Sequence, residues 1–212
     1  MLSFLTNETR PLPLNPPRFK EDRVKYFNNC DEEIILDDYK KDLKSDSLVA
    51  NQFEFITRKT IVCNVCKTVT NIYQKHTSLT LDLANSLEQS LSDFTNTRVN
   101  KKFSCLECKK HTKADETTYF SSLPRYLLFQ SKRFKEEEDK FVKLNSRSSY
   151  NIDLNMARYS ENGIGTHIKG NDIYELVSVV IHENADEMHS GSFATYSKRG
   201  DNWTYFKDED VV

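Results

Sequence analysis

The stretches Cys63-Asn64-Val65-Cys66 and Cys105-Leu106-Glu107-Cys108 decide how this chain folds. Each separates two cysteines by two residues, a spacing that lets both sulfurs turn to one side. Two such knuckles supply the four thiolates of a tetrahedral structural zinc, and a closed site of this kind leaves no position for a substrate. Disulfides or free core cysteines fit the doubled spacing less well. The sequence therefore predicts a structural Zn²⁺ held by Cys63, Cys66, Cys105 and Cys108.

The thirty-eight residues between Cys66 and Cys105 exceed the gap of a compact zinc ribbon and must hold structure of their own. Residues 79–83 alternate as a strand, and Ser86 followed by Gln89 is typical of a helix N-terminus with a capping box. The buried face of that helix would consist of Leu87, Leu91 and Phe94. The two knuckles are therefore expected to lie close together in space, although a long folded segment separates them in the sequence.

The segments before the first knuckle predict an arm and then helices. Prolines at positions 11, 13, 16 and 17 favour an extended arm over residues 1–19. Apolar residues then recur at three- and four-residue steps from residue 18 to about 43, which predicts one or two amphipathic helices. Phe53 and Phe55 alternate towards the first knuckle and residues 69–73 follow it, so this knuckle is expected at a turn between strands.

Strands dominate the second half of the chain. Residues 125–130 form the most apolar stretch and predict a central strand. An antiparallel meander with short turns is predicted for residues 174–181, 193–198 and 203–206. Residues 199–201 suit one of these turns because they include Gly200. The predicted fold class is α+β, with helices early and a sheet late.

Composition and charge narrow the classes of function. The chain has 212 residues, a net charge of -2 and a pI near 6.2, so it exerts no general attraction on nucleic acid or anionic lipid. No apolar run approaches membrane-spanning length, and the first ten residues lack the basic leader of a secretory signal. Thiolate zinc ligands and the remaining Cys30 suit a reducing compartment. The sequence predicts a cytoplasmic or nuclear protein without a membrane partner, and it disfavours nucleic acid as a partner.

Several motifs follow one another in a characteristic order. They are Phe53-Glu54-Phe55, the first knuckle, residues 78–83, residues 86–94, the second knuckle, residues 123–134, residues 174–182, residues 190–193, Trp203 with Phe206, and Asp208 with Val211. In this order and spacing the chain resembles the ubiquitin-specific protease family, a papain-like set of cysteine deubiquitinases shaped as fingers, palm and thumb. Residues 31–35 are similar to an acidic-then-apolar helix start on the thumb side. The resemblance covers roughly residues 30–212.

The resemblance implies a papain-like cysteine-protease fold with an incomplete thumb. Residues 1–19 would be an extended Pro-rich arm, and residues 20–212 a partial protease domain. The parts of that domain would be a thumb remnant (20–50), fingers with a four-cysteine zinc ribbon (51–120) and a palm (121–212). In the family the zinc lies at the fingertips, far from the cleft, where the fingers cradle ubiquitin. Because the family domain normally starts earlier and extends further, we expect a diverged remnant or a partial gene product.

The catalytic positions implied by the resemblance depart from the family's pattern. The nucleophile belongs to an N-terminal box with a Gly-rich, Asn-containing turn, and nothing of that kind precedes Cys30. Cys30 is a poor stand-in, because its neighbours Asp31 and Glu32 disfavour the thiolate that a nucleophile needs. The family activity is thiol-dependent deubiquitination, and this chain lacks the box that would supply its thiol.

The base and its orienting group are altered as well. Gly191-Ser192-Phe193 occupies the family's Gly-His-Tyr triplet, and a hydroxyl is too weakly basic to take a thiol proton. His189 is a poor stand-in because three residues along a loop exceed hydrogen-bond tolerance. Lys207 stands where the orienting group follows Trp-x-x-Phe, and lysine cannot accept the imidazole N–H. Asp208 matches a neighbouring acidic position instead. No catalytic residue is intact, and no organic cofactor is expected.

These departures predict an inactive deubiquitinase domain that binds ubiquitin, a ubiquitinated protein or another protein partner. Two alternatives stay open: a fragment of an active thiol-dependent deubiquitinase, and a zinc-ribbon module in a splicing or nucleic-acid complex. The second knuckle is surrounded by Lys101, Lys102, Lys109, Lys110 and Lys113. These lysines could form an anion-binding patch, although a solvated hairpin face is the first expectation.

Overall fold

The computed structural model describes residues 24–28, 52–138, 140–160, 172–183 and 190–212. The proline-rich arm, most of the predicted early helices, Cys30 and His189 lie outside these ranges. The chain divides into two compact units, one from residues 1–78 and 97–128 and the other from residues 79–96 and 129–212. The knuckles therefore belong to the first unit, whereas the strand and helix of the excursion between them belong to the second.

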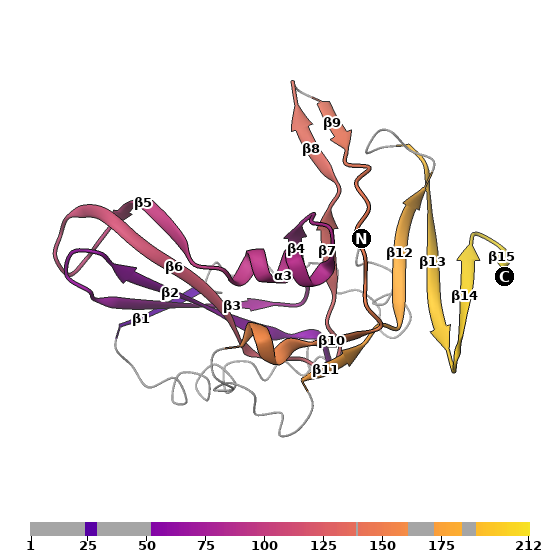
Figure 1. Ribbon diagram of the computed structural model, residues 1–212, viewed down its shortest axis with the longest axis horizontal. Coiled ribbons are helices and arrows are strands. Elements are labelled where there is room, and N and C mark those ends of the chain that lie inside the picture. The colour runs from indigo at the N-terminus through magenta and orange to yellow at the C-terminus, as the bar shows by residue number, and fades with distance from the viewer. Residues whose placement is uncertain (1–23, 29–51, 139, 161–171, 184–189) are drawn as a thin grey trace, which may run out of the picture. The chain divides into compact units, whose positions relative to one another are not determined.

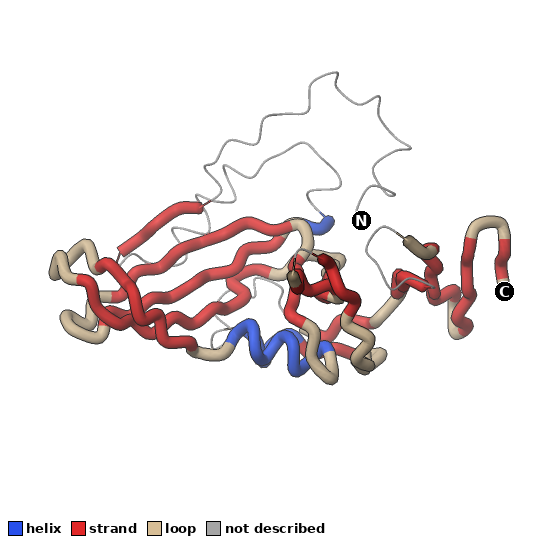
Figure 2. Tube along the Cα trace, turned by 90° about the horizontal axis from the view of Figure 1, so that it is seen from above, coloured by secondary structure: helices blue, strands red, loops and turns tan. Residues whose placement is uncertain are grey.

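The first unit contains a five-stranded antiparallel sheet with the strand order β1-β3-β2-β6-β5 (Figure 1). Its strands are β1 (Val24–Asn28), β2 (Phe55–Cys63), β3 (Val69–His76), β5 (Arg98–Ser104) and β6 (His111–Ser122). Strand β2 lies in the middle, paired with β3 on one side and with β6 on the other. The long strands run side by side as red tubes in Figure 2.

Aromatic residues hold together the end of this sheet that lies away from the knuckles. Phe55 begins β2 and stacks on Phe120 of β6 and on His76 of β3, with ring centroids 5.8 Å and 5.2 Å apart. Phe55, Phe120 and Tyr73 are each about 1% exposed, so the cluster forms the core of the unit. Offset stacking adds to the free energy gained when these rings leave water.

The predicted helix is wrong for residues 24–28, which form β1. This strand pairs antiparallel with β3, from Val24 opposite Gln74 to Asn28 opposite Thr70. The apolar spacing that suggested a helix is a local signal, whereas an edge of β3 offers unpaired backbone N–H and C=O groups to an extended segment. Pairing of the backbone along that edge decides the conformation.

The second unit begins with residues 79–96, which lie between the two knuckles in the sequence. Strand β4 (Leu79–Asp82) and helix α3 (Leu87–Thr95) confirm the predicted strand and helix. Strand β4 pairs in parallel with β7 (Phe129–Lys132). Leu79 and Leu81 of β4 and Leu91 of α3 are buried, as their alternating and helical spacings require. In the described part of the chain, no helix is both long and apolar enough to cross a membrane.

Helix α3 has half of the predicted capping box. Ser86 Oγ accepts a hydrogen bond of 3.1 Å from the backbone N–H of Gln89. The Gln89 side chain does not complete the box, because its Nε2 donates instead to Asp93 Oδ1 at 2.8 Å, one turn along the helix. Ser90 Oγ donates to the carbonyl oxygen of Asp82 at 2.8 Å and so ties the helix to β4.

Short elements and a small sheet complete the second unit. A hairpin joins β8 (Phe134–Glu137) to β9 (Lys140–Lys143), and β10 (Asp153–Asn155) pairs with β11 (Ile173–Glu175). A 3₁₀-helix, η1 (Met156–Tyr159), follows β10. The C-terminal sheet has the order β12-β13-β14-β15, formed by Ser178–Glu183, Ser192–Arg199, Asn202–Lys207 and Asp210–Val211. The predicted meander is confirmed, and Gly200 turns β13 into β14 with a φ of 60°.

Two predicted strands have different bounds in the structure. The central strand expected at residues 125–130 begins only at Phe129, and it pairs with β4 alone among the described strands. Pro124 lacks a backbone N–H, and the N–H of Tyr126 bonds to the carbonyl of Gln52 at 3.0 Å instead of to a ladder.

The strand predicted at residues 174–181 is divided into β11 and β12. Between them, the Leu176 N–H donates to the carbonyl of Ile152 at 2.7 Å, and the Val177 carbonyl accepts the N–H of Lys198 at 2.8 Å. The backbone at this point changes partner from one sheet to the next. A continuous apolar run in the sequence contains no sign of that exchange.

Candidate functional site

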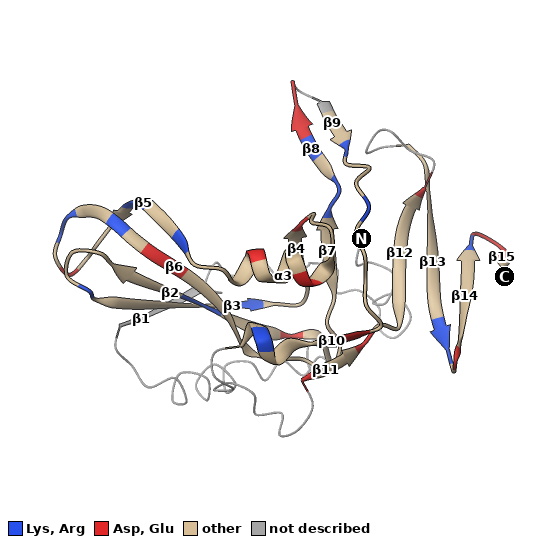
Figure 3. Ribbon diagram, viewed as in Figure 1, with Lys and Arg blue, Asp and Glu red and all other residues tan. Residues whose placement is uncertain are grey.

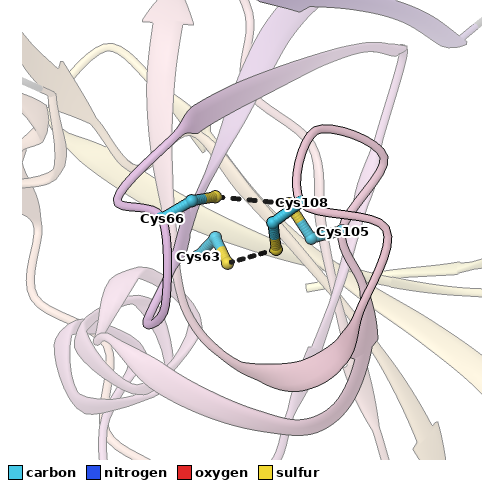
Figure 4. Close-up of side chains that lie close together, drawn as sticks. All are labelled: Cys63, Cys66, Cys105 and Cys108. Carbon is cyan, nitrogen blue, oxygen red and sulfur yellow. Dashed lines mark hydrogen bonds between the residues drawn. The ribbon is translucent and has the colours of Figure 1, made fainter.

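Two turns of the first unit bring four cysteines together (Figure 4). Cys63 ends β2 and Cys66 lies in the turn to β3, whereas Cys105 and Cys108 lie in the turn between β5 and β6. The turns leave the sheet at the same end, because β6 pairs with both β2 and β5. The Sγ atoms are 4.0 Å apart in Cys63 and Cys108 and 3.5 Å apart in Cys66 and Cys105, and all four lie within 4.8 Å of one another.

Backbone hydrogen bonds give both turns a similar bent form. In the first, the N–H of Cys63 donates to the carbonyl of Thr68 at 3.0 Å. In the second, the N–H of Cys105 donates to the carbonyl of Lys110 at 3.0 Å. The residue after each second cysteine, Lys67 or Lys109, has a φ of 60° or 52°, a left-handed conformation that glycine adopts more readily. Each turn thus accepts one strained residue that lets its two sulfurs face the same side.

The four sulfurs fit a tetrahedral zinc ion. With Zn–S bonds of about 2.3 Å, a tetrahedron places its sulfurs about 3.8 Å apart, which lies between the separations of the Cys66–Cys105 and Cys63–Cys108 pairs. Cys63 and Cys105 are buried and Cys66 is exposed, so the site is shielded on one side only. All four thiols are free of disulfides. The geometry is compatible with the predicted structural zinc site and provides no open position for a substrate.

The surroundings change the acidity of two of these thiols in opposite directions. Hydrogen bonding with the side chain and the backbone of Thr68 lowers the pKa of the Cys66 thiol to about 6. Burial, together with the neighbouring thiols, raises the pKa of the Cys108 thiol to about 12. A metal binds thiolates, and Cys66 is the more readily ionised of these two ligands. Cys108 would release its proton when the cation binds, because the positive charge stabilises the thiolate.

The C-terminal sheet places Ser192 and Lys207 beside one acidic residue, Glu183. Ser192 begins β13 directly opposite Glu183, which ends β12. Lys207 ends β14, and its Nζ lies 3.0 Å from Glu183 Oε2. The hydroxyl of Tyr205 donates to the same carboxylate oxygen at 3.2 Å. Two of the positions singled out in the sequence therefore meet around a carboxylate that sequence reasoning did not identify.

Glu183 and Lys207 hold each other in the charged form. The hydrogen bond from Lys207 lowers the pKa of the Glu183 carboxyl, and the same bond raises the pKa of the Lys207 ammonium. Both groups are consequently ionised at neutral pH. The signal that could have identified Glu183 is its place at a strand end, opposite the start of the next strand of a predicted meander.

Two further residues that are described in the structure, His182 and Asp208, lie next to this cluster in the sequence. His182 precedes Glu183, but its Nε2 lies 2.7 Å from the carbonyl oxygen of Ser190 and its ring stacks on Phe193 with centroids 4.8 Å apart. Asp208 lies in the turn after Lys207 with a φ of 51° and an exposed side chain. Among the described residues, Asp208 forms no hydrogen bond or ion pair with Ser192, and Cys30 and His189 fall outside the described ranges.

Comparison with known proteins identifies the family. The model of the ubiquitin carboxyl-terminal hydrolase family matches residues 20–212, nearly the whole chain. The chain therefore belongs to this family of deubiquitinases. The resemblance to the ubiquitin-specific proteases, first seen in the order of short motifs, is confirmed.

Curated relatives share the same family name. The chain is 28% identical over 174 residues to the probable ubiquitin carboxyl-terminal hydrolase 16 of Schizosaccharomyces pombe, across 79% of this chain and 36% of that protein. It is 29% identical over 131 residues to ubiquitin carboxyl-terminal hydrolase 10 of Saccharomyces cerevisiae, across 58% of this chain and 16% of that protein. The chain thus spans little more than a third of the first relative and less of the second.

Solved structures confirm the predicted fold. A chain of the SAGA Ubp8/Sgf11/Sus1/Sgf73 DUB module bound to ubiquitin aldehyde matches with a TM-score of 0.65 and 26% identity, over 85% of this chain and 43% of that one. The module with a variant Ubp8, bound to monoubiquitin, matches with a TM-score of 0.68 and 25% identity, over 85% and 41%. The chain covers less than half of these structural relatives.

Proposed function

We propose that this domain binds ubiquitin or a ubiquitinated protein and does not hydrolyse the isopeptide bond. The observation that carries the proposal is the ion pair of Lys207 with Glu183 beside Ser192. These are the positions where the family resemblance expects the orienting group and the catalytic histidine. A lysine–glutamate pair and a hydroxyl cannot perform their roles.

The chemical argument concerns protons. A cysteine protease needs an imidazole that accepts the thiol proton and a partner that accepts the imidazole N–H. The Ser192 hydroxyl is not a base at neutral pH, and Lys207 offers only donors, one of them already given to Glu183. Both residues lie in strands of the C-terminal sheet, Ser192 in β13 and Lys207 in β14.

Ubiquitin binding is supported by the structural relatives. Among the solved structures that match this chain, one module is bound to ubiquitin aldehyde and another to monoubiquitin. We propose that residues 51–120 form fingers and residues 121–212 a palm, with a thumb remnant at 20–50 and an extended arm at 1–19. In this arrangement Cys63, Cys66, Cys105 and Cys108 would hold Zn²⁺, and the cytosol or nucleus would keep them reduced.

The zinc would stabilise the folded structure of the fingers. When bound, it supplies no acid or base, because all four of its positions are taken by sulfur. The four cysteines would link the β2–β3 turn to the β5–β6 turn. These turns are distant in the sequence, since Cys63 and Cys108 are separated by 45 positions. Such a clamp limits how far the two hairpins can separate.

A second candidate is a piece of an active enzyme whose nucleophile lies on other sequence. The observation that favours it is the coverage, because the chain spans only 36% to 43% of the relatives that it matches over most of its length. Under this hypothesis Ser192 and Lys207 would have to function in catalysis as they stand.

The test combines ubiquitin titration, zinc determination and a ubiquitin C-terminal reporter on one purified sample. We expect saturable ubiquitin binding, one zinc per chain and no turnover of the reporter. Turnover that disappears in Cys30→Ala would overturn the proposal, and so would a zinc-loaded, folded chain without ubiquitin affinity.

A second experiment distinguishes the two candidate functions. In it, an upstream segment that carries the family's Cys box is fused to this chain, and turnover of the reporter is measured. The fragment hypothesis predicts turnover with Ser192 and Lys207 in place. Our proposal predicts turnover only after Ser192→His and Lys207→Asn are introduced together, with either single variant inactive.

A further inference from the structure

The two knuckle turns form a surface of unusual composition, which we call the tip surface and define as residues 63–68 and 99–113. It contains six lysines and a single acidic residue, Glu107, within a chain whose net charge is -2. The lysines are Lys67, Lys101, Lys102, Lys109, Lys110 and Lys113, and all six side chains are exposed. Figure 3 shows the blue segments around the β5–β6 turn.

Paired strands and turns hold these lysines in one region. Lys101 and Lys102 lie where the register of β5 against β6 shifts, between Asn100 opposite Ala114 and Phe103 opposite Thr112. The carbonyl of Lys113 accepts the N–H of Asn64 at 3.0 Å, which joins β6 to the first knuckle. Because the four sulfurs lie within 4.8 Å of one another, the lysines after each knuckle belong to the same end of the sheet.

The charges on this surface are not neutralised within the described residues. None of the six lysines takes part in an ion pair there, whereas Lys75, Lys132, Lys135, Lys198 and Lys207 all do. The acidic side chains at the base of the tip bind amides instead, with Asn100 Nδ2 2.7 Å from Glu116 Oε1 and Asn64 Nδ2 3.5 Å from Asp115 Oδ1. A concentrated positive field therefore faces solvent.

Aliphatic side chains stand out among these charges. Leu106 is 87% exposed, more than any other large hydrophobic residue in the described part of the chain, and Val65 is 55% exposed. Both occupy the interior of a Cys-x-x-Cys knuckle, where zinc binding makes no demand on the side chain. An exposed leucine surrounded by lysines can contact an apolar side chain of a partner whose acidic residues the lysines attract.

We propose that the tip surface binds an acidic peptide segment that carries aliphatic or aromatic anchor residues. The lysines attract its carboxylates, and Leu106 and Val65 contact its apolar side chains. Single-stranded nucleic acid fits the surface less well, because its bases stack on exposed aromatic rings, and His111 is the one exposed side chain of the tip that carries such a ring. This partner is additional to ubiquitin and is tested without it.

The experiment uses the full zinc-loaded chain and three labelled probes. One is a Glu- and Asp-rich peptide of about 15 residues with three leucines, long enough to cross the tip. The second is the same peptide with serines in place of the leucines, and the third is an oligothymidylate of similar length. Fluorescence anisotropy is recorded at low and high salt, because the attraction between exposed charges is screened.

We expect the leucine peptide to bind at least tenfold more tightly than the serine peptide and the oligothymidylate, and to weaken at high salt. Leu106→Ser should reduce that affinity about tenfold, which corresponds to about 1.4 kcal/mol. Lys109→Gln/Lys110→Gln should weaken it several-fold, whereas the charge-matched control Lys132→Gln/Lys135→Gln, outside the tip, should leave it unchanged. Zinc content and circular dichroism establish that each variant is folded.

Three outcomes of the probe and lysine comparisons would overturn the proposal, and a fourth concerns Leu106. They are equal affinity for the leucine and serine peptides, an equal effect of the tip and control lysine pairs, and tighter binding of the oligothymidylate. The last would assign the surface to nucleic acid instead. Leu106→Ser removes a side chain that is almost wholly in solvent, so a folded variant with unchanged affinity would also contradict it.

Discussion

Lys207 and Glu183 are joined by an ion pair of 3.0 Å although their strands, β14 and β12, are not neighbours in the sheet. Strand β13 lies between them, and its first residue, Ser192, is paired with Glu183. The side chains therefore meet across the start of the intervening strand and link three strands at one end. At this end of the sheet, side chains of β12 and β14 are joined by a contact around the Glu183 carboxylate.

Lys207→Gln should lower the melting temperature of the domain, because Glu183 loses its charged partner and keeps the hydrogen bond from the Tyr205 hydroxyl. The effect should be modest and should shrink at high salt, since both side chains are partly exposed. It should also shrink in acid: Glu183 has a lowered pKa when folded, so its contribution is present above the unfolded pKa and is lost as the pH falls through the folded pKa. Thermal melts of the variant and the parent at several pH values test this. A difference that grows in acid would contradict the assignment.

Removal of the metal should unfold the tip of the first unit. Structural zinc sites contribute on the order of 10 kcal/mol of binding free energy that is coupled to folding. Cys105→Ser, at a buried ligand, should lose zinc and lower the melting temperature, whereas the control Cys30→Ser should retain one zinc per chain. Elemental analysis and thermal melts before and after treatment with a chelator check this. Unchanged zinc content in Cys105→Ser would rule out the four-cysteine site.

His76 should make the first unit sensitive to mild acid. Burial lowers the pKa of His76 to about 4, and its Nε2 lies 2.8 Å from Thr57 Oγ1. The unfolded chain binds the proton more readily, so the contribution of His76 is full above about pH 6.5 and is lost as the pH falls towards 4, by at most about 3 kcal/mol. Denaturant unfolding between these pH values measures it. His76→Gln should flatten this part of the profile, whereas acid release of a metal would affect both proteins alike.

Helix α3 should depend on one half of its capping box. Ser86→Ala removes the acceptor of the Gln89 N–H and should cost about 1 kcal/mol of unfolding free energy. Gln89→Ala should cost only a few tenths, because its side chain bonds to Asp93 rather than back to the cap. Urea unfolding of both variants compares them. Equal costs would indicate that the full box forms in solution.

Patterns that act over a few residues were readable in the sequence. The Cys-x-x-Cys spacing depends on the local turn, so both knuckles and their convergence were predicted. Ser86 and the alternation of Leu79 with Leu81 likewise define α3 and β4 without help from distant segments. The meander from β12 to β14 follows from alternation and from Gly200.

Pairing between distant segments was not readable. Residues 24–28 have a helical pattern and form β1, because an edge of β3 satisfies their backbone groups. The strand predicted from residue 125 begins only at Phe129, where β7 starts to pair with β4. The two strands are far apart in the sequence, since Thr80 and its partner Gln130 are separated by 50 positions. Such choices depend on which edge is available, and no local period encodes that.

The sequence by itself determined the family, the four sulfur ligands and the identity of Ser192 and Lys207, since each depends only on which residue stands at which spacing. Only the tertiary structure decided that Glu183 joins Lys207 beside Ser192. It alone decided, too, that Leu106 stands exposed among lysines that form no ion pair with any residue the structure describes. The physical reason is that an ion pair and an exposed fraction are properties of neighbours in space, and strand pairing brings together residues that the chain keeps far apart.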